Sequence, residues 1–499
     1  MGIGVFVCGL TGCFTFYKIV CMRCSVSGFW QWGRSNFCYD LWRCFGRGVA
    51  VANYVSERNG MPKRQHEIRD PVHAFNHYDD DERRVIDSEP FQRLRYIHQL
   101  AMTYQVYPGA THRRFEHSLG CMELATRIFN TITAHNNLNG LHPEHREMLS
   151  ELEDGGKLGY WRKVLRLAAL CHDMGHLPFS HAAEDLLPEG VTHETITKRI
   201  IKSLGDLWSG MTPPVTPEHI IKVAVGPKEA GDLSPFTPWE RILAEIVTGD
   251  VFGADRMDYL LRDSLHAGVT YGHFDHHRLI DTLRILPGVA QDDSQEYSDE
   301  PELGIEQGGL QVAESLLMAR YLMFSQIYFH HVRRVYDLHL KQFLKATLDE
   351  GTYPSVLNEF LSITDNEILC RIRASAKDAD NPGHIAAVCI SQRQHFRKVY
   401  TCMAQDIAHD FNALDLVKQG LAAEVGAENI LVDTVDKGMA SSSVFPILAD
   451  DARILSSFGE SRLMTNLPAA TTGYLFVHPA KRKKACDWVR KNVRSIFNH

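Results

Sequence analysis

The chain has 499 residues, of which 44% are hydrophobic, and it carries a formal net charge of -8 at pH 7. This length allows two to four ordinary domains or one large core with appendages, and the apolar content is ample for a buried interior. The negative balance argues against a surface that coats nucleic acid generally, although a local basic cleft is compatible with it.

The first 60 residues differ from the rest. Their apolar opening, residues 1–17, is short for a membrane span of about 20 residues, and no basic residue precedes it as in a signal peptide. Cys21 and Cys24 have the spacing of half a zinc knuckle but lack a second matching pair, which disfavours a structural zinc. We expect residues 1–60 to be a poorly ordered or spurious extension, with the biological chain starting near Met61.

The six cysteines beyond residue 44 are scattered and suggest no disulfide framework. This usage is typical of a reducing compartment, so we expect a cytoplasmic protein without a membrane partner.

Helical periodicity dominates the region between residues 61 and 350. Apolar positions recur every three and four residues in five segments, which predicts helices within 88–130, 165–187, 192–204, 238–266 and 309–347. Pro238 after Thr237 suits a helix start, whereas the acidic stretch 291–296 predicts a loop. Beyond residue 350, residues 444–447 and 474–477 are short strand candidates. The sequence therefore predicts a mainly α-helical bundle with a smaller mixed α+β C-terminal region, residues 351–499.

The densest group of chemically active side chains lies between residues 170 and 181 and comprises His172, Asp173, His176 and His181. His172 and His176 stand at i and i+4, so on a helix both imidazoles would project from one face and could share an ion or a phosphate. A second adjacent pair, His409 and Asp410, has no histidine four residues on. The first group therefore predicts a metal-centred site.

Two other segments offer further ligands. Residues 111–120 contain His117, and in residues 255–263 the side chains of Asp255, Tyr259 and Asp263 fall at i, i+4 and i+8, on one helical stripe. Mixed imidazole and carboxylate ligands suit Zn, Fe, Mn or similar divalent ions, and the residues alone do not rank these metals.

These blocks carry a resemblance to a known family. The chain resembles the HD-domain phosphohydrolases and, within them, the deoxynucleoside triphosphate triphosphohydrolases, which include bacterial dGTPases. The resemblance covers residues 65–345, and its blocks are residues 69–73, 91–97, 107–120, 170–181 and 255–263. It implies an HD-domain helical core at 61–350, a homo-oligomer, and hydrolysis of a deoxynucleoside triphosphate to deoxynucleoside and inorganic triphosphate.

The resemblance also implies site roles. One divalent ion, with Mn, Fe, Zn, Ni and Mg all left open, would be bound by His117, His172, Asp173 and Asp255. Three histidines and one carboxylate would lie near the phosphates: His176, His181, His193 and Glu184. We favour His181 as the general acid because a carboxylate such as Glu184 raises an imidazole's basicity, and His193 is the alternative.

The resemblance also implies substrate contacts from seven further residues, of which only Leu100 is purely hydrophobic. Arg114 corresponds to a phosphate-facing arginine, whose planar fork suits bidentate contacts. Sugar, base and triphosphate contacts correspond to Gln99, Leu100, Tyr259, Asp263, Arg320 and Tyr328. Arg320, Phe324 and Tyr328 share one predicted helical face. Phe324 stands where the vertebrate members have a histidine, so base preference stays open.

Regulation and alternative functions are also left open. Asp87, Gln92 and Arg95 match a regulatory nucleotide site of the vertebrate members, but His66 replaces a phosphate-neutralising lysine, so a nucleotide activator is not established. The second hypothesis is an HD phosphohydrolase acting on a mononucleotide, a cyclic dinucleotide or an alarmone. The third is a catalytically silent nucleotide sensor or nucleic-acid-binding module, which the complete set of candidate ligands disfavours.

Overall fold

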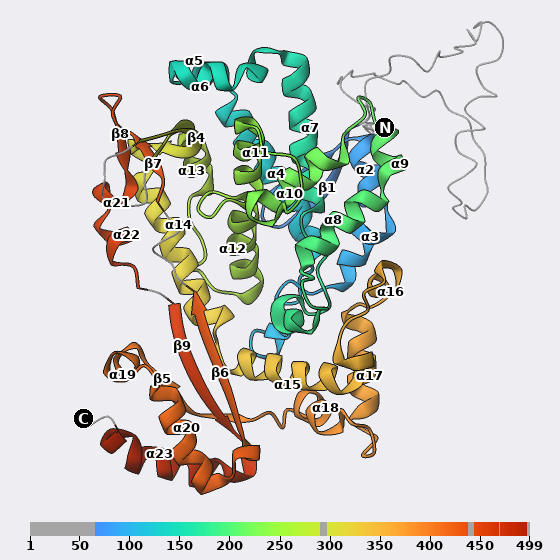
Figure 1. Ribbon diagram of the computed structural model, residues 1–499, viewed down its shortest axis with the longest axis vertical. Helices are drawn as coiled ribbons and strands as arrows, with labels where there is room; N and C mark the ends of the chain where they lie inside the picture. The colour runs from blue at the N-terminus through green and yellow to red at the C-terminus, as the bar shows by residue number, and fades with distance from the viewer. Residues whose placement is uncertain (1–64, 290–296, 438–443, 469, 497–499) are drawn as a thin grey trace, which may run out of the picture. The chain divides into compact units, whose positions relative to one another are not determined.

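The protein is described here by a computed structural model, shown in Figure 1, that covers residues 65–289, 297–437, 444–468 and 470–496. The chain divides into two units, residues 1–62 and 63–499, and all described residues belong to the second. The expectations for residues 1–60, for Met61 and for the acidic loop 291–296 lie outside the described residues. Across the described ranges, no helix is both long and apolar enough to cross a membrane.

The fold is mainly α-helical, as predicted, and it includes three small sheets. The first part of the described chain contains β1 (His66–Asp70), β2 (Ala74–Tyr78), α2 (Asp80–Ile86), α3 (Glu89–Gln92), η1 (Arg93–Tyr96), η2 (Thr103–Gln105), α4 (Arg114–Ile132), α5 (His135–Asn139), α6 (Pro143–Met148), η3 (Ser150–Glu153), α7 (Gly155–Cys171), η4 (Ser180–Leu186), α8 (His193–Ser203), α9 (Gly205–Ser209), α10 (Pro217–Glu229), α11 (Pro238–Thr248) and α12 (Ala254–Ala267).

The second part contains α13 (His276–Thr282), β3 (Leu283–Val289), β4 (Tyr297–Glu306), η5 (Gln307–Gly309), α14 (Leu310–Met323), the π-helical turn η6 (Phe324–Tyr328), α15 (His331–Thr347), η7 (Asp349–Gly351), α16 (Leu357–Leu361), α17 (Asp365–Ser375), α18 (His384–Ser391), β5 (Arg397–Cys402), α19 (Ala404–His409), α20 (Ala413–Val425), η8 (Ala427–Asn429), β6 (Ile430–Lys437), β7 (Pro446–Leu448), β8 (Ile454–Ser456), α21 (Ser457–Glu460), α22 (Arg462–Asn466), β9 (Ala470–Val477), η9 (Pro479–Lys481) and α23 (Arg482–Ile496).

Helix α4 lies at the centre of the helical core, where it packs against both α7 and α12. Its apolar side chains, including Leu119, Ala125 and Ile128, are buried in one large cluster with those of α7 and α11. Gly120 lets α12 approach closely, because a Cβ at this position would lie 2.0 Å from the Asp258 carboxylate. This close approach brings the start of α12 against the N-terminal turns of α4.

The helix start predicted at Pro238 and the polar stripe predicted for Asp255, Tyr259 and Asp263 are confirmed. Helix α11 begins at Pro238, and the Thr237 side chain accepts from the backbone of Glu240 in a capping box. Helix α12 begins directly after Gly253, so it carries Asp255 and the two later polar residues of the predicted stripe on one continuous helix.

The helix predicted for residues 165–187 is wrong beyond Cys171, where α7 ends. Residues 172–175 form a turn, in which the backbone N–H of Met174 donates to the carbonyl oxygen of Cys171. Gly175 makes this turn possible beside α8, because a Cβ there would lie 2.1 Å from the carbonyl oxygen of His193. His172 and His176 are therefore presented by a turn rather than by one helical face.

The segment 309–347 is helical but interrupted. Helix α14 passes into the π-helical turn η6, and α15 begins only at His331. The prediction of four-residue α-helical spacing through Phe324 and Tyr328 is wrong in detail, since a π-turn shifts the register of the following residues. Their rings still pack edge to face, with centroids 4.9 Å apart.

The three sheets are a β1–β2 hairpin, a four-stranded sheet in the order β3–β4–β7–β8, and an antiparallel sheet in the order β5–β9–β6. Strand candidates at 444–447 and 474–477 correspond to parts of β7 and β9, whereas the β3–β4 hairpin within the predicted core was not anticipated. Because β7 pairs in parallel with β4, residues beyond 350 complete this sheet. The domain boundary at 350 stays a prediction.

The β5–β9–β6 sheet has helices on both faces. Helices α20 and α23 cover one face through an apolar cluster that includes Val417 and Leu475, and α15 and α18 contact the other through Val335 and Phe476. In Figure 1 these elements form the lower, orange to red part of the second unit. Within the described residues, the six cysteines are all free thiols.

Candidate metal centre and its surroundings

The structure brings together the four residues predicted to bind metal. Nε2 of His117 lies 3.1 Å from Oδ1 of Asp255 and 3.6 Å from Oδ2 of Asp173. Nε2 of His172 lies 3.7 Å and 3.5 Å from the same two carboxylates. Ligand atoms that share one ion at about 2.0–2.2 Å from each are about 3 to 4 Å apart, so these separations fit a common cation.

The two imidazoles present the correct nitrogen to such an ion. Nδ1 of His117 lies 2.8 Å from the Asp258 carboxylate, and Nδ1 of His172 lies 2.8 Å from the carbonyl oxygen of Ala169. These contacts hold the ring protons on Nδ1 and leave both Nε2 lone pairs facing the carboxylates. Nε2 of His172 is buried without a hydrogen-bond partner among the described residues. A divalent cation would satisfy this atom, so the residues fit the metal that their pattern predicts.

Cys121 adds a thiol that the sequence reasoning missed. His117, Cys121, His172 and Asp255 offer ligand atoms that all lie within 4.8 Å of one another. However, Sγ of Cys121 lies 3.6 Å from Nδ1 and 3.5 Å from Nε2 of His117, which places the sulfur beside the ring rather than along the Nε2 lone pair. The geometry therefore favours Asp173 over Cys121 as the fourth ligand.

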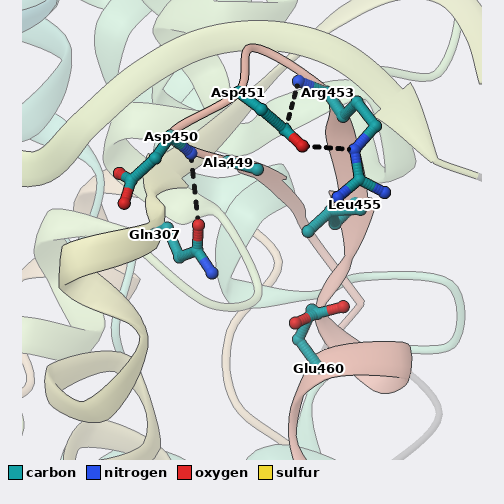
Figure 2. Close-up of a pocket in the computed structure, with 7 residues that line it drawn as sticks. All are labelled: Gln307, Ala449, Asp450, Asp451, Arg453, Leu455 and Glu460. Carbon is teal, nitrogen blue, oxygen red and sulfur yellow. Dashed lines mark hydrogen bonds and ion pairs between the residues drawn. The ribbon is translucent and has the colours of Figure 1, made fainter.

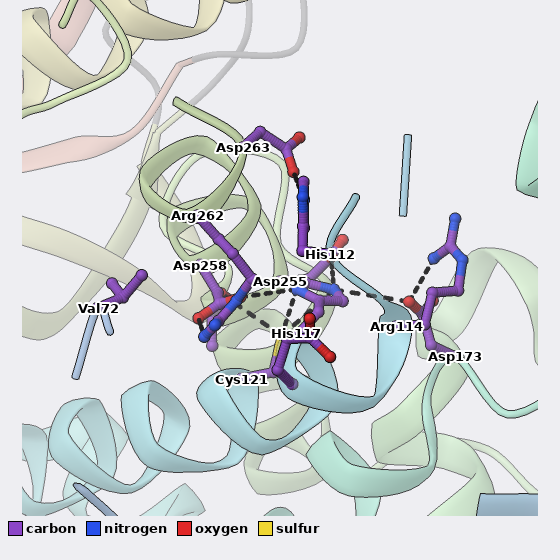
Figure 3. Close-up of polar contacts among 12 residues, drawn as sticks. Val72, His112, Arg114, His117, Cys121, Asp173, Asp255, Asp258, Arg262 and Asp263 are labelled. Atoms are coloured by element: carbon purple, nitrogen blue, oxygen red, sulfur yellow. Dashed lines mark hydrogen bonds and ion pairs between the residues drawn. The ribbon is translucent and has the colours of Figure 1, made fainter. Parts of the chain in front are cut away.

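A buried network of ion pairs contacts His117 on the side that faces away from the other candidate ligands (Figure 3). Asp258 accepts two hydrogen bonds of 2.8 Å from Arg262 and lies 2.6 Å from Nε2 of His73. Arg262 donates a further bond of 2.9 Å to Asp70, which ends β1. The network thus runs from the β1–β2 hairpin through α12 to the Nδ1 atom of His117.

The surroundings of Asp255 and Asp258 on α12 favour the charged forms of both carboxylates. Burial raises the pKa of Asp255, but the adjacent imidazoles of His117 and His172 outweigh burial and hold this pKa below its usual value. Burial also raises the pKa of Asp258. The charge of Arg262 and the hydrogen bonds that Asp258 accepts outweigh burial and hold this pKa well below its usual value. Both carboxylates are therefore anionic at neutral pH, as a cation site requires.

The three histidines predicted to face phosphate also lie together. The rings of His176 and His193 stack with centroids 4.0 Å apart, and the His181 ring lies 4.8 Å from that of His176. Glu184 contacts the two histidines next to His176. It lies 2.8 Å from Nδ1 of His181 and makes a short contact with Nδ1 of His193. The group adjoins the metal ligands, since Nε2 of His176 lies 3.3 Å from Asp173.

The members of this trio differ in exposure and charge. Burial and the nearby Arg114 and His193 hold the pKa of His176 well below its usual value. Burial lowers the pKa of His193, but its bond to Glu184 outweighs this and raises it. The side chain of His181 is 61% exposed and that of His193 only 15%. Glu184 thus supports His193 as directly as it supports His181.

Arg114 connects the two groups. Its guanidinium forms a short ion pair with Asp173 and donates a bond of 2.9 Å from Nε to Oγ of Ser180. A buried arginine against a metal ligand can also face phosphate, because its fork has five donors.

The predicted sugar-contacting residues form a second polar group. Tyr328 donates a bond of 2.7 Å to Asp263, whose other oxygen lies 2.7 Å from Nε2 of His112. The Tyr259 ring meets the Tyr328 ring edge to face at 6.2 Å. The backbone N–H of Gln99 donates to the carbonyl oxygen of His112, which joins the Gln99 segment to this group.

Two further predicted contacts carry unsatisfied atoms. Oε1 of Gln99 and Nε of Arg320 are buried without a hydrogen-bond partner in the described part of the chain. Arg320 donates one bond, from NH1 to the carbonyl oxygen of Asp250, and lies 5.9 Å from the Phe324 ring. Leu100, next to Gln99, is buried. Buried polar atoms normally have partners, so these two atoms are available to a ligand.

The residues that match a regulatory nucleotide site are engaged with neighbours. Nε of Arg95 donates to Gln92 at 2.8 Å, and its guanidinium lies 3.5 Å from the centre of the Phe115 ring. His66 pairs with Asp80 at 2.7 Å. These contacts neither establish nor exclude an activator, and the regulatory site stays a prediction.

Sequence reasoning assigned no role to Asp70, His73, His112, Asp258 or Arg262. The block 69–73 was noted only as a match, and Asp258 lies three residues after a candidate ligand. A buried carboxylate one helical turn from a ligand was a usable signal, because metal-binding histidines commonly donate their second N–H to such a group. The role of the β1–β2 hairpin had no such local signal.

A surface pocket lies away from this centre (Figure 2). It has a volume of about 210 Å³ and is lined mainly by residues 449–455 around β7 and β8, with Gln307 and Glu460. Asp451 pairs with Arg453 at 2.7 Å, and Gln307 accepts from the backbone of Asp450. The Asp451–Arg453 pair is exposed, and we assign no chemistry to this pocket.

Comparison with known protein families agrees with this geometry. Residues 114–219 match the family described as HD domain, and residues 274–475 match the HD associated region. The chain belongs to the HD-domain superfamily. An HD domain implies a metal-dependent phosphohydrolase, and the matched range contains three of the four candidate metal ligands, with Asp255 following it.

Individual relatives extend the comparison. The chain is 35% identical over 315 residues to an uncharacterized protein of Methanocaldococcus jannaschii, covering 61% of this chain and 57% of that one. It is 28% identical over 429 residues to the bovine deoxynucleoside triphosphate triphosphohydrolase SAMHD1, covering 76% and 68%. A solved structure of a hypothetical protein from Aquifex aeolicus is 29% identical, with a TM-score of 0.67, covering 85% and 100%.

The chain spans only 51% to 59% of the length of four of the curated relatives that it matches. The printed names of those four describe them as uncharacterized proteins, so they do not indicate a substrate.

Proposed function

We propose that this protein hydrolyses deoxynucleoside triphosphates to deoxynucleoside and inorganic triphosphate in a metal-dependent reaction. The observation that carries the proposal is the convergence of His117, His172, Asp173 and Asp255 beside the three-histidine group. The likeness to bovine SAMHD1, whose name states this activity, extends over 76% of the chain and supports the choice of substrate.

In the proposed reaction, a divalent ion held by the four ligands supplies Lewis-acid chemistry toward a phosphoryl oxygen and water. The chain's own residues position the triphosphate and neutralise its developing charge, which dominates catalysis of phosphoryl transfer. The candidates for this role are Arg114, His176, His193 and Arg320. The two arginines are buried cations, whereas His176, whose pKa is held low, would donate a hydrogen bond in its neutral form. Gln99 and Leu100 would contact the deoxyribose, with Tyr259 and Asp263 on its other side.

A proton must reach the leaving O5′ oxygen when the bond to the α-phosphorus breaks. The pair of His181 and Glu184 is our preferred donor, because Glu184 lies 2.8 Å from Nδ1 of His181 and orients its imidazole. His193 is the alternative donor, since Glu184 bonds to it as well. Replacing each histidine by glutamine separates the two, because only the donor's loss should abolish the basic limb of the pH–rate profile.

Product analysis tests the proposal directly. Purified protein is incubated with Mn²⁺ and each deoxynucleoside triphosphate, and the products are separated by ion exchange, with Asp173→Ala as the control for contaminating activity. We expect deoxynucleoside and intact triphosphate with the unaltered chain and neither with the variant. The relative rates with the four substrates give the base preference.

Other products would change the assignment. Monophosphate and pyrophosphate would mean that a different bond is broken. Turnover of a mononucleotide, cyclic dinucleotide or alarmone, with triphosphates inert, would favour another HD phosphohydrolase. Nucleotide binding without turnover would favour a silent sensor.

Three further features stay untested. The family resemblance implies assembly into a homo-oligomer and leaves activation by a nucleotide open, and the scattered cysteines predict a cytoplasmic location. Light scattering with and without added nucleotide tests the first two together, and a shift from monomer to oligomer on nucleotide addition would support both.

A further inference from the structure

Helix α15 and the segment after it contact η4, which follows the turn of residues 176–181 that carries His176 and His181. The backbone N–H of Tyr353 donates to the carbonyl oxygen of Leu186 at the end of η4. Lys341 pairs with Asp185 at 3.0 Å. This contact region continues to the start of α17, where Asp365 lies fully buried.

Both carboxylate oxygens of Asp365 accept bonds from segments far away in the sequence. Oδ1 accepts from the backbone N–H of Phe179 at 2.8 Å. Oδ2 accepts from the backbone N–H of His98 at 2.8 Å and forms a short contact with Nδ1 of the same residue. One side chain thus joins the histidine-bearing turn to the segment that contains Gln99 and Leu100.

An acidic residue in the first turn of a helix has an ordinary explanation, namely favourable interaction with the helix dipole and its free N–H groups. That explanation does not account for Asp365. The start of α17 is already capped by Thr364, whose side chain accepts from Asn366, and by Glu367, which accepts from the backbone of Thr364. The bonds of Asp365 point away from its own helix.

The turn that Asp365 holds has an unfavourable backbone. Phe179 and Ser180 have φ values of 59° and 55°, in the left-handed region that residues with a side chain rarely occupy. Such a conformation is unfavourable for residues with a side chain and persists only where the surroundings enforce it. The bond to the Phe179 N–H is one such constraint.

A second constraint comes from the same region. Arg93 donates from NH1 to the carbonyl oxygen of His176 at 2.7 Å and from NH2 to that of Ile363 at 2.9 Å. It therefore bridges the first residue of the turn to the residue two before Asp365.

The held turn leads directly to the metal centre. Oγ of Ser180 donates to the carbonyl oxygen of His98 at 2.9 Å and accepts from Nε of Arg114. Arg114 in turn pairs with the candidate ligand Asp173. A displacement of the turn would consequently move His176, His181 and the guanidinium of Arg114 together.

We propose that Asp365, supplied by the HD associated region, is a positioning residue that fixes the 176–181 turn and thereby the side chains that face the phosphates. Its effect on turnover rests on the proposed function, whereas its effect on the turn does not. The HD associated region then contributes to the active site without touching substrate.

The test compares Asp365→Asn with Glu367→Gln, two isosteric losses of a carboxylate charge in the same turn of α17. Amide hydrogen exchange is followed in peptides covering residues 177–183, alongside bound metal and the thermal midpoint. We expect Asp365→Asn to accelerate exchange in these peptides at least tenfold, with metal content unchanged. Glu367→Gln should leave this exchange unchanged, because it does not contact the turn.

Steady-state kinetics supply the second readout. A misplacement of about 1 Å can cost on the order of 100-fold in rate, so kcat of Asp365→Asn should fall 10- to 100-fold with a much smaller change in KM. Glu367→Gln should keep kcat within about twofold, because the hydrogen bonds of Glu367 go to Thr364 and not to the turn. A binding measurement with inorganic triphosphate on Mn²⁺-loaded protein should show weaker affinity for Asp365→Asn only.

Unchanged exchange in residues 177–183 would overturn the proposal, as would equal kinetic losses in both variants at matched thermal midpoints. If Asp365→Asn does not fold, Arg93→Lys replaces it in the same measurements, because lysine cannot bridge the carbonyl oxygens of His176 and Ile363. Should the unaltered chain turn over no nucleotide, the proposed function fails, while the exchange and triphosphate-binding results still decide the role of Asp365.

Discussion

At the scale of single residues, each metal-facing imidazole is held through the nitrogen that points away from the cluster. For His117 this support is a carboxylate, Asp258, and for His172 it is a backbone carbonyl oxygen. A carboxylate fixes the tautomer and also makes the ligand nitrogen more basic. Asp258 itself is held by Arg262, whose second partner is Asp70.

Asp258→Asn should therefore weaken metal binding 10- to 100-fold, the usual cost of losing such a partner. The amide can still contact His117, but it carries no charge and one of its two polar atoms is a donor. Asp70→Asn, one step further from the imidazole, should have a smaller effect. The dissociation constant for Zn²⁺ or Mn²⁺, measured by competition with a chelator, checks both variants without any substrate.

The control is Glu240→Gln, which breaks a comparably buried ion pair with Lys222. Removing one partner of such a pair destabilises a fold by about 3–5 kcal/mol wherever it lies. If the control weakens metal binding as much as Asp258→Asn does, the effect reflects general destabilisation, and the specific role of Asp258 is wrong.

The candidate metal ligands could be predicted from the sequence, whereas the residues that support them could not. His117, His172, Asp173 and Asp255 could be predicted to converge because their order and types match a family. The supporting residues could not, because Asp70 and Asp365 act through contacts with segments about two hundred residues away in the sequence. No local period or spacing encodes such contacts.

At the scale of secondary-structure elements, the packing of α11 on β4 creates an electrostatic cost. Glu245 on α11 accepts a bond of 3.0 Å from the backbone N–H of Leu303 on β4. Burial, together with the nearby Glu302 and Asp250, nevertheless raises the pKa of Glu245 to about 8. The folded protein therefore retains a proton here between pH 4.5 and about 8, whereas the unfolded chain has released it.

Because the folded state binds more protons in this window, its contribution to stability is fully present below pH 4.5 and is lost as the pH rises toward 8. Glu245→Gln keeps an acceptor for Leu303 and removes the titration. We expect the variant to be more stable than the unaltered chain at pH 8, by about 1–3 kcal/mol after allowance for solvent screening.

Denaturant unfolding at pH 4 and at pH 8 measures this effect, with the acidic condition as the internal control. The gain should be absent at pH 4, where both chains are neutral at this position. An equal gain at both pH values would mean that packing rather than ionisation separates the two side chains.

Elements were predictable where local signals suffice. Pro238 after Thr237 marked the start of α11, and the polar stripe of α12 followed from its periodicity. The end of α7 at Cys171 was not predictable. Gly175 is only a weak helix breaker and Pro178 comes later, so the turn depends on the contact of Gly175 with Thr197 of α8. The β3–β4 hairpin was missed because β7, from much later in the chain, completes its sheet.

At the scale of the whole molecule, the proposed centre joins α4, the turn after α7 and the first turn of α12, which come together only when the core has formed. An ion that is held by side chains from all three segments binds to the folded state only. Its binding free energy therefore adds to the stability of the folded unit. Asp365 and Arg93 extend the same assembly to the C-terminal half through the 176–181 turn.

Removal of metal should consequently lower the stability of the core as a whole. At a free ion concentration 100 times the dissociation constant, a single site stabilises the folded state by about 2.7 kcal/mol, which corresponds to a few degrees in the thermal midpoint of a unit this large. Calorimetry of chelator-treated protein, before and after addition of Mn²⁺ or Zn²⁺, measures the shift. Asp173→Ala should start from its own midpoint and respond weakly to either ion, because one of four ligands is missing. A midpoint that moves equally in Asp173→Ala and the unaltered chain would assign the stabilisation to ions bound elsewhere and would remove this centre from the argument.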